Sequence, residues 1–256
     1  MDINLLVINV GNSRVAIGAF VQGELTYTRR VSLEQRSDIE TALDEAWASL
    51  RESDADVAAA SVNPVMNEAI EQAIVRATKQ PVQWVGREIN IPMKVKTDLP
   101  QKTGVDRVLV TAAAYVLMQK ACVVVDAGTA ITVNLCSDAG EFLGGAIAPG
   151  AQLMLKSLNE HTAKLPLIEL AVPEAALGKS TEQAMLSGVY HGIRGMVKEL
   201  VEGFALDLGN WPEVICTGGD AQLLFEGWEL AHAVSPDLML YGIAHAYTEH
   251  QLKHAD

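Results

Sequence analysis

The sequence predicts an α/β fold made of two similar halves, because one segment of the chain occurs twice. Asn9-Val10-Gly11-Asn12, followed by Gly23-Glu24, recurs about 117 residues later as Asp126-Ala127-Gly128-Thr129, followed by Gly140-Glu141. An apolar run that is typical of a buried strand precedes each copy, at residues 5–8 and 122–125. Strand and helix patterns alternate along both halves, which favours a mixed sheet flanked by helices in each.

Each copy predicts a three-stranded meander. After the glycine-containing turn, a second strand (residues 15–20 and 131–136) leads through a tight Gly-Glu turn to a third strand (residues 25–31 and 142–147). Two similar lobes of this kind could face each other across a phosphate group. A phosphotransferase is therefore the first functional hypothesis.

The segments around the meanders complete the two halves. In the first half we expect helices at residues 37–51, 67–78 and 105–119, strands at 57–62 and 82–85, and an extended segment at 91–98. In the second half we expect helices at 152–158, 180–204 and 240–252 and a strand at 213–216. These patterns predict an N-terminal half of residues 1–115 and a C-terminal half of residues 116–256, with no low-complexity linker between them.

The composition argues against several classes of protein. The chain has 256 residues, 49% of them hydrophobic, which is enough for a sizeable core, and its net charge of -13 argues against a nucleic-acid surface. Cys122, Cys136 and Cys216 lie singly in apolar runs, which indicates neither zinc nor disulfides and favours a reducing compartment. No apolar stretch is long enough for a membrane span, and residues 1–13 lack the basic start of a signal peptide. We therefore expect a cytoplasmic protein that does not enter a membrane.

The glycine turns are the first candidates for phosphate binding. A glycine lets the backbone approach a phosphate closely and offer N–H donors, and Asn12, Ser13 and Thr129 add an amide or a hydroxyl beside it. A third turn, Thr217-Gly218-Gly219, follows a later strand and would suit the ribose or the flat face of a nucleoside. A single turn of this kind is usually structural, but two at matched spacing together with a third favour a ligand.

Two other phosphate motifs fail on inspection. Gly178-Lys179-Ser180-Thr181 resembles the end of a P-loop, but Pro173 stands where the loop needs its first glycine and has no N–H to donate. No GxGxxG segment follows a strand, so a Rossmann dinucleotide site is not supported. Thr181 could instead contact an anionic ligand from the first turn of its helix, or it could cap that helix.

Two aspartates are candidates for chemistry. Asp106 stands in Gly104-Val105-Asp106-Arg107 at the start of a helix, where a carboxylate is stabilised and could act as a base, although it could also be only a helix-start acid. Asp126 ends an apolar strand, where a carboxylate is costly unless it is paired or binds a cation. The six histidines show no ligand spacing.

Eight segments, taken in order along nearly the whole chain, resemble the motifs of type III pantothenate kinases. They are Asn9-Val10-Gly11-Asn12-Ser13, Gly104-Val105-Asp106-Arg107, Val125-Asp126-Ala127-Gly128-Thr129-Ala130, Gly144-Gly145-Ala146-Ile147-Ala148-Pro149-Gly150, Thr162-Ala163-Lys164-Leu165-Pro166, Gly178-Lys179-Ser180-Thr181, Thr217-Gly218-Gly219 and Leu240-Tyr241-Gly242. Each segment is common by itself, but the ordered set is specific.

The resemblance implies a duplicated actin-like (ribonuclease H-like) kinase fold and a defined activity. That activity is the ATP-dependent phosphorylation of pantothenate to 4'-phosphopantothenate, the first step of coenzyme A biosynthesis. The expected cofactors are ATP, Mg²⁺ and a monovalent cation, K⁺ or NH₄⁺. The expected assembly is a homodimer with the substrate site near the subunit contact.

The resemblance also implies a role for each matching residue. Asp106 would be the base that takes the proton from the pantothenate hydroxyl, and Asp126 would bind the monovalent cation. The residues expected at pantothenate are Thr97, Gly104, Val105, Arg107 and Thr181. The residues expected at ATP are Asn9, Gly11, Asn12, Ser13, Arg14, Gly128, Thr129, Thr217, Gly218 and Gly219.

The chain departs from the family pattern at three positions near the expected substrates. Asn9 stands where the family usually has an aspartate that helps to hold magnesium, Thr97 where it has a tyrosine and Val110 where it has an asparagine. We expect an active kinase, which could be slow or shifted in substrate. The alternatives are a catalytically impaired protein of this family that binds a nucleotide or a partner, and a sugar or acyl kinase of the wider fold.

Overall fold

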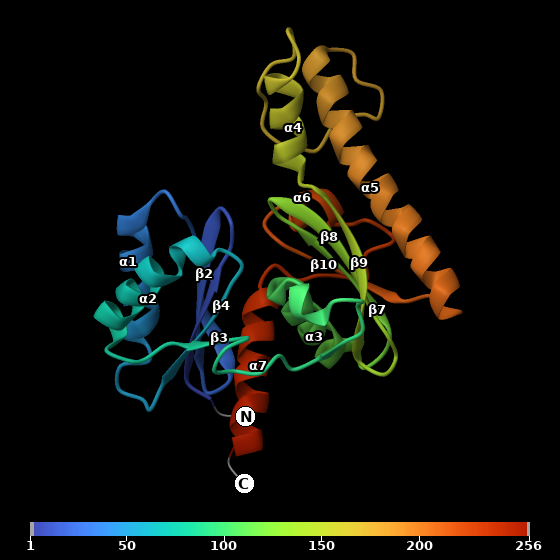
Figure 1. Ribbon diagram of the computed structural model, residues 1–256. Helices are drawn as coiled ribbons and strands as arrows, with labels where there is room; N and C mark the ends of the chain where they lie inside the picture. The colour runs from blue at the N-terminus through green and yellow to red at the C-terminus, as the bar shows by residue number, and fades with distance from the viewer. Residues whose placement is uncertain (1–2, 255–256) are drawn as a thin grey trace. The chain divides into compact units, whose positions relative to one another are not determined.

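The computed structural model describes residues 3–254, which form two compact units (Figure 1). Unit 1 contains the described residues up to Lys94, Leu99–Ala113 and those from Asp237 onward, and unit 2 contains Val95–Asp98 and Ala114–Pro236. The boundary between Ala113 and Ala114 lies close to the expected division after residue 115. The expected C-terminal half differs from unit 2 in its last helix, because that helix packs against the sheet of unit 1.

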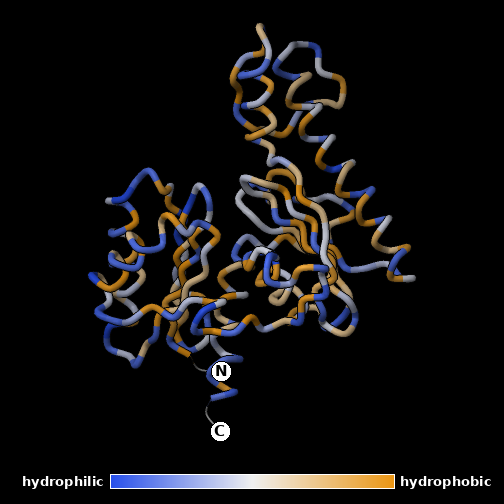
Figure 2. Tube along the Cα trace, viewed as in Figure 1, coloured by the Kyte–Doolittle hydropathy of each residue, from blue (hydrophilic) through white to orange (hydrophobic). Residues whose placement is uncertain are grey.

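The sheet of unit 1 is mixed. Its strands, in spatial order, are β3 (Glu24–Ser32), β2 (Arg14–Val21), β1 (Leu5–Val10), β4 (Asp56–Ser61) and β5 (Gln83–Trp84). The first three form the expected antiparallel meander, whereas β4 is parallel to β1 and β5 is parallel to β4. Figure 2 shows the central strands mostly in the hydrophobic colour, as expected for a sheet that is covered on both faces.

Helices cover both faces of this sheet. On one face, α1 (Arg36–Ala48) and α2 (Pro64–Thr78) pack on a core that includes Leu6 and Ile8 of β1. On the other face, Leu5 and Val7 of β1 pack with Leu109 of α3 (Val105–Met118) and with α7 (Leu238–His254). Successive side chains of β1 thus enter opposite cores, in keeping with the period of two in a strand.

The sheet of unit 2 has the same plan with one strand added. Its strands, in spatial order, are β11 (Ala233–Val234), β10 (Glu213–Thr217), β7 (Cys122–Ala127), β8 (Ala130–Cys136), β9 (Glu141–Pro149) and β6 (Lys94–Val95). The strands β7, β8 and β9 form the second meander, and β10 is parallel to both β7 and β11. The helices α4 (Ala151–Glu160), α5 (Thr181–Leu208) and α6 (Ala221–Phe225) pack on one face of this sheet.

The duplication predicted from the sequence is confirmed in the order of the elements. In each copy a meander is followed by helix, strand, helix, strand and helix, with two differences. Two helices, α4 and α5, stand in the second copy where α1 stands alone in the first, and β6 and a short 3₁₀ helix (Pro100–Lys102) stand before α3 in the first copy only. Both meanders also carry a register shift at the same place, between Ala19 and Phe20 and between Leu135 and Cys136. The two glycine turns differ by one residue, since residues 11–14 separate the paired ends of β1 and β2 and residues 128–130 separate those of β7 and β8. The chain therefore repeats its architecture as well as its short motifs.

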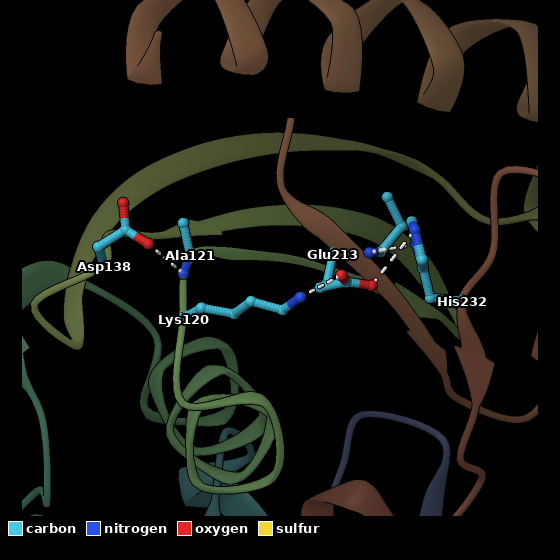
Figure 3. A network of polar contacts seen from close by, with 6 residues as sticks. Lys120, Ala121, Asp138, Glu213 and His232 are labelled. Carbon is cyan, nitrogen blue, oxygen red and sulfur yellow. Dashed lines mark hydrogen bonds and ion pairs between the residues drawn. The ribbon is translucent and has the colours of Figure 1, made fainter. Parts of the chain in front are cut away.

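A polar network joins the beginnings of β7 and β10 in unit 2 (Figure 3). Glu213 accepts from Lys120 Nζ at 2.5 Å and lies 3.2 Å from His232 Nε2, while His232 Nδ1 accepts from the Val214 N–H at 2.9 Å. Because Nδ1 accepts, Nε2 carries the proton and faces the carboxylate. The network lies at the ends of β7 and β10 opposite to their glycine turns, so it supports the sheet without touching those turns. Among residues 3–254, no helix has the length and apolar character needed to cross a membrane.

Candidate functional site

The first glycine turn connects β1 to β2 in unit 1 and leaves polar groups at the surface. The Gly11 N–H donates to the Arg14 carbonyl at 3.0 Å, while Asn12, Ser13 and Arg14 are exposed and Asn9 is half-buried at the end of β1. The Nδ2 of Asn63, a residue that sequence reasoning missed, lies 3.4 Å from the Gly11 carbonyl. The turn is thus fixed from within the fold while its side chains face outward.

Asp106 is held in the first turn of α3, also in unit 1. Its Oδ1 accepts from the Arg107 N–H at 2.8 Å. A Cβ on Gly104 would lie 2.6 Å from the same oxygen, so the glycine at 104 leaves the space that the carboxylate occupies. Burial raises the pKa of Asp106, and the N–H and positive charge of Arg107 oppose this only in part. A carboxylate with a raised pKa is more basic, as a proton-accepting group requires.

Arg107 and Val110 both lie on α3, where the first is half-buried and the second is completely buried. Burial lowers the pKa of the half-buried Arg107 guanidinium, and the charge of Asp106 opposes this effect. An arginine in this setting still keeps its positive charge at neutral pH. Val110, which departs from the family pattern, is 1% exposed. It therefore contributes a buried apolar side chain and presents no polar group to a ligand.

The second glycine turn connects β7 to β8 in unit 2. The Gly128 N–H donates to the Ala130 carbonyl at 3.0 Å, and the Gly150 N–H at the start of α4 donates to the Thr129 carbonyl at 3.0 Å. A Cβ on Gly150 would lie 2.1 Å from the Gly128 carbonyl, so α4 approaches this turn as closely as a backbone can. Thr129 is exposed. The structure thus places a rigidly supported hydroxyl at the tip of the turn.

The third turn lies directly against the second. The Asp220 N–H donates to the Ala127 carbonyl at 2.9 Å, and a Cβ on Gly218 would lie 2.4 Å from both that carbonyl and Asp126 Oδ1. The structure therefore brings Asp126 and the turn after β10 together. Thr217 is 2% exposed and its Oγ1 contacts the Pro236 carbonyl at 3.5 Å, so the turn presents Gly218 and Gly219 to the surface rather than the threonine side chain.

Of the two glycines Gly128 and Gly218 in these turns, the backbone requires only one. Gly218 has φ +97° and no room for a side chain, so the fold itself demands glycine there. Gly128 has no such backbone requirement, and the nearest atoms to a Cβ at this position would be 3.9 and 4.0 Å away, at ordinary contact distance. Glycine at position 128 thus leaves open the space beside the turn that a methyl group would occupy.

Thr97 and Thr181, both expected at pantothenate, are in unit 2. Thr97 is half-buried beside β9, with its Cγ2 3.8 Å from where a Cβ of Gly144 would lie. Thr181 is the exposed first residue of α5, but the N-cap is Ser180, whose Oγ accepts from the Gln183 N–H at 3.2 Å. The Gln183 side chain accepts in turn from the Lys179 N–H at 3.0 Å, so it ties the residue before the cap to the first turn of the helix. The capping alternative for Thr181 is therefore wrong.

Asp126 is the only one of the predicted site residues proposed as a metal ligand. Among the described residues, no group of three or more His, Cys, Asp or Glu side chains could hold a metal ion. The three cysteines are buried and free, and burial raises the pKa of Cys216 to about 12. A cation at Asp126 would thus complete its coordination with carbonyls, water or phosphate oxygens, which suits hard cations that bind together with a nucleotide.

Solved structures with the same architecture come from several functional classes. A Campylobacter jejuni protein assigned to the Baf family of transcriptional activators superposes with a TM-score of 0.62 at 22% identity, covering 96% of this chain and 99% of that one. Component A of the (R)-2-hydroxyglutaryl-CoA dehydratase of Acidaminococcus fermentans gives a TM-score of 0.57 at 15% identity, covering 99% and 100%. MreB5 of Spiroplasma citri bound to AMPPNP gives 0.50 at 10% identity, covering all of both chains. These likenesses confirm the actin-like fold.

Sequence comparison identifies the family. The model of the type III pantothenate kinase family matches residues 5–203. The type III pantothenate kinase of Dehalococcoides mccartyi strain CBDB1 is 37% identical over 250 residues, covering 95% of each chain, and that of Brevibacillus brevis is 31% identical over 253 residues, covering 96% of this chain and 99% of the relative. With three quarters of its length matched by the family model and relatives covered almost from end to end, this chain belongs to the type III pantothenate kinase family.

Proposed function

We propose that this protein transfers the γ-phosphoryl group of ATP to the hydroxyl of pantothenate, the first step of coenzyme A biosynthesis. The observation that carries the proposal is Asp106, a half-buried carboxylate with a raised pKa at the family's Gly-Val-Asp-Arg segment. Its relatives over nearly the whole chain are named type III pantothenate kinases. The described residues contain nothing that favours a catalytically impaired binding protein instead.

Asp106 would accept the proton of the attacking hydroxyl. The Arg107 N–H fixes Oδ1, which leaves Oδ2 as the oxygen that could face the substrate. Phosphoryl transfer needs little covalent help from the protein, and its barrier is lowered mainly by positioning and by neutralising charge. A base held in one orientation supplies the first requirement. We assign Gly104, Val105, Arg107, Thr97 and Thr181 to the binding of pantothenate, where Arg107 would neutralise its carboxylate.

The glycine turns would hold ATP. The space over Gly128 and the exposed Thr129 hydroxyl suit a phosphate, and Gly218 and Gly219 offer a flat backbone surface to the nucleoside. Asn9, Gly11, Asn12, Ser13 and Arg14 would serve the first turn, and Thr217 would support the third from within the fold. MreB5, with the same fold, binds AMPPNP.

The cations and the assembly are further parts of this proposal. Mg²⁺ would reach the site with the ATP phosphates, and the amide of Asn9 would bond to a metal-bound water in place of a carboxylate. Asp126 would bind a monovalent cation, K⁺ or NH₄⁺, because a half-buried carboxylate at a strand end is stabilised by a cation. We also propose a cytoplasmic homodimer as the working form of the protein.

One experiment tests the central proposal. ATP consumption by the purified protein is measured with and without pantothenate, each with K⁺ or with Na⁺ as the monovalent cation, for the wild type and for Asp106→Asn. We expect turnover that requires pantothenate and K⁺ and is lost in the variant. Turnover of a sugar or a short-chain acid in place of pantothenate, or wild-type rates in Asp106→Asn, would contradict the assignment.

A further inference from the structure

Arg194 makes an unusual set of contacts on the inner side of α5, in unit 2. Its guanidinium carbon lies 4.4 Å from the ring centroid of Tyr190 and 5.6 Å from that of Trp228. Trp228 in turn stacks on Phe225, with ring centroids 5.4 Å apart. Arg194 Nε donates to the Leu224 carbonyl at 2.6 Å. The planar guanidinium is thus held by aromatic rings and aimed at one backbone oxygen.

That oxygen belongs to the last turn of α6, which depends on outside support. The last carbonyls of a helix have no partner within the helix, and a cation at this end is favoured by the helix dipole. With only the five residues Ala221–Phe225, α6 is far too short to be stable alone. Leu224 and Phe225 are completely buried. Arg194 therefore adds a side-chain hydrogen bond at the C-terminal end of a short helix that is otherwise held by its packing and by backbone hydrogen bonds at its start.

The helix α6 continues directly from the third glycine turn. The Leu224 N–H donates to the Asp220 carbonyl at 3.0 Å, and the Ala221 N–H donates to the Gly218 carbonyl at 3.3 Å. On its other side the turn is anchored by the bond from the Asp220 N–H to the Ala127 carbonyl. A displacement of α6 would thus pass to Gly218 and Gly219 through a single turn of helix.

We propose that Arg194 is a positioning residue for nucleotide binding: it clamps α6 and thereby holds the Gly218-Gly219 turn in the geometry that receives the nucleoside of ATP. The inference rests on the proposed function, since it assumes that ATP binds at this turn. Arg194 itself touches no substrate in this scheme. The clamp acts on the binding of ATP, whereas Asp106 and Arg107 belong to α3 and Thr181 stands at the opposite end of α5 from the residues that follow Arg194.

The test compares three variants by their affinity for ATP, measured by calorimetry without pantothenate, and by their KM values for both substrates. Arg194→Gln removes the charge and the stacking, Arg194→Lys keeps the charge alone, and Val197→Ala destabilises the same helix from a completely buried position while leaving Arg194 in place. We expect Arg194→Gln to weaken ATP binding by roughly tenfold, because a displaced turn would lose contact with the nucleoside equal to about one hydrogen bond. Its KM for pantothenate should stay at the wild-type value. Arg194→Lys should bind ATP with intermediate affinity, and Val197→Ala should lower Tm with unchanged ATP affinity.

Two results would overturn the inference. One is wild-type ATP affinity in Arg194→Gln, and the other is an equal loss of affinity in Val197→Ala, which would show a general effect of lower stability. If Arg194→Gln does not fold, Arg194→Lys decides by the same two criteria. Because ATP binding is measured directly, a wild type that binds ATP without phosphorylating pantothenate would refute the proposed function while the comparison of ATP affinities still decided the role of Arg194.

Discussion

Replacing Gly128 with alanine separates a structural role of the second glycine turn from a role in binding ATP. The new Cβ would meet no atom closer than 3.9 Å. Since this backbone is not left-handed either, the variant should fold normally, with a free energy of unfolding raised by about 0.4–1 kcal/mol through the stiffer unfolded chain. A phosphate seated on the turn would be pushed away by the methyl group. The loss of one charged hydrogen bond costs about 1.5–3 kcal/mol, which is roughly a tenfold to over a hundredfold weaker Kd for ATP.

The assay pairs thermal unfolding with calorimetric titration of ATP, and Gly218→Ala is the matched control. At Gly218, φ is +97° and a Cβ would lie 2.4 Å from the Ala127 carbonyl, so this variant should lose about 1–3 kcal/mol of stability from backbone strain alone. Gly128→Ala should thus keep its Tm and lose ATP, whereas Gly218→Ala should lose Tm. Wild-type ATP affinity in Gly128→Ala would refute the idea that phosphates rest on this turn.

Three further predictions concern single side chains. Asp106→Asn should have a higher free energy of unfolding than the wild type at neutral pH, by about 1.4 kcal/mol for each unit by which burial raises the pKa of the Asp106 carboxyl. The reason is that the wild type loses stability as the pH rises from the pKa of this carboxyl in the unfolded chain through its higher pKa in the folded protein. Urea unfolding from pH 3 to pH 8 measures the difference between the two proteins, which should vanish at low pH. Asn9→Asp should raise kcat by roughly tenfold to a hundredfold at saturating Mg²⁺ if a carboxylate here holds the metal ion that neutralises charge in the transition state. An unchanged kcat would place Asn9 away from the metal. Ser180→Ala should lower the free energy of unfolding by about 1 kcal/mol through loss of the α5 cap, while Thr181→Ala should leave it unchanged; equal losses in a pair of urea titrations would be inconsistent with the observed cap.

The sequence predicted the long elements well because their signals are local. The two meanders, their glycine turns and the helices α3 and α5 begin within a few residues of the expected positions. The elements that it missed include α6, β11 and the 3₁₀ helix Pro100–Lys102, which contain five, two and three residues and are too short for any periodic pattern to show. The placement of α7 in unit 1 was also missed, because it depends on packing between residues far apart in the chain.

In the candidate site too, the sequence predicted the features that depend on neighbouring residues and missed those that depend on contacts between distant segments. Residue types and order identified Asp106, Asp126 and the glycine turns. The sequence did not reveal that Gly150 presses on the second turn or that Arg194 holds α6, since each contact joins separate segments. The burial of Thr217 follows from strand pairing in the same way.

The membership of α7 in unit 1 has a consequence for the synthesis of the protein. One face of the first sheet is covered by α1 and α2 soon after it is made, but the face that carries Leu5, Val7 and Phe20 is covered only in part by Leu109 of α3 until α7 is added. Unit 2 is almost continuous in sequence and is translated before that helix. At roughly 5–20 residues per second, the ribosome therefore leaves part of an apolar sheet face uncovered for many seconds. The part of the protein that is made first is the last to be finished, and in that interval it is a natural substrate for chaperones.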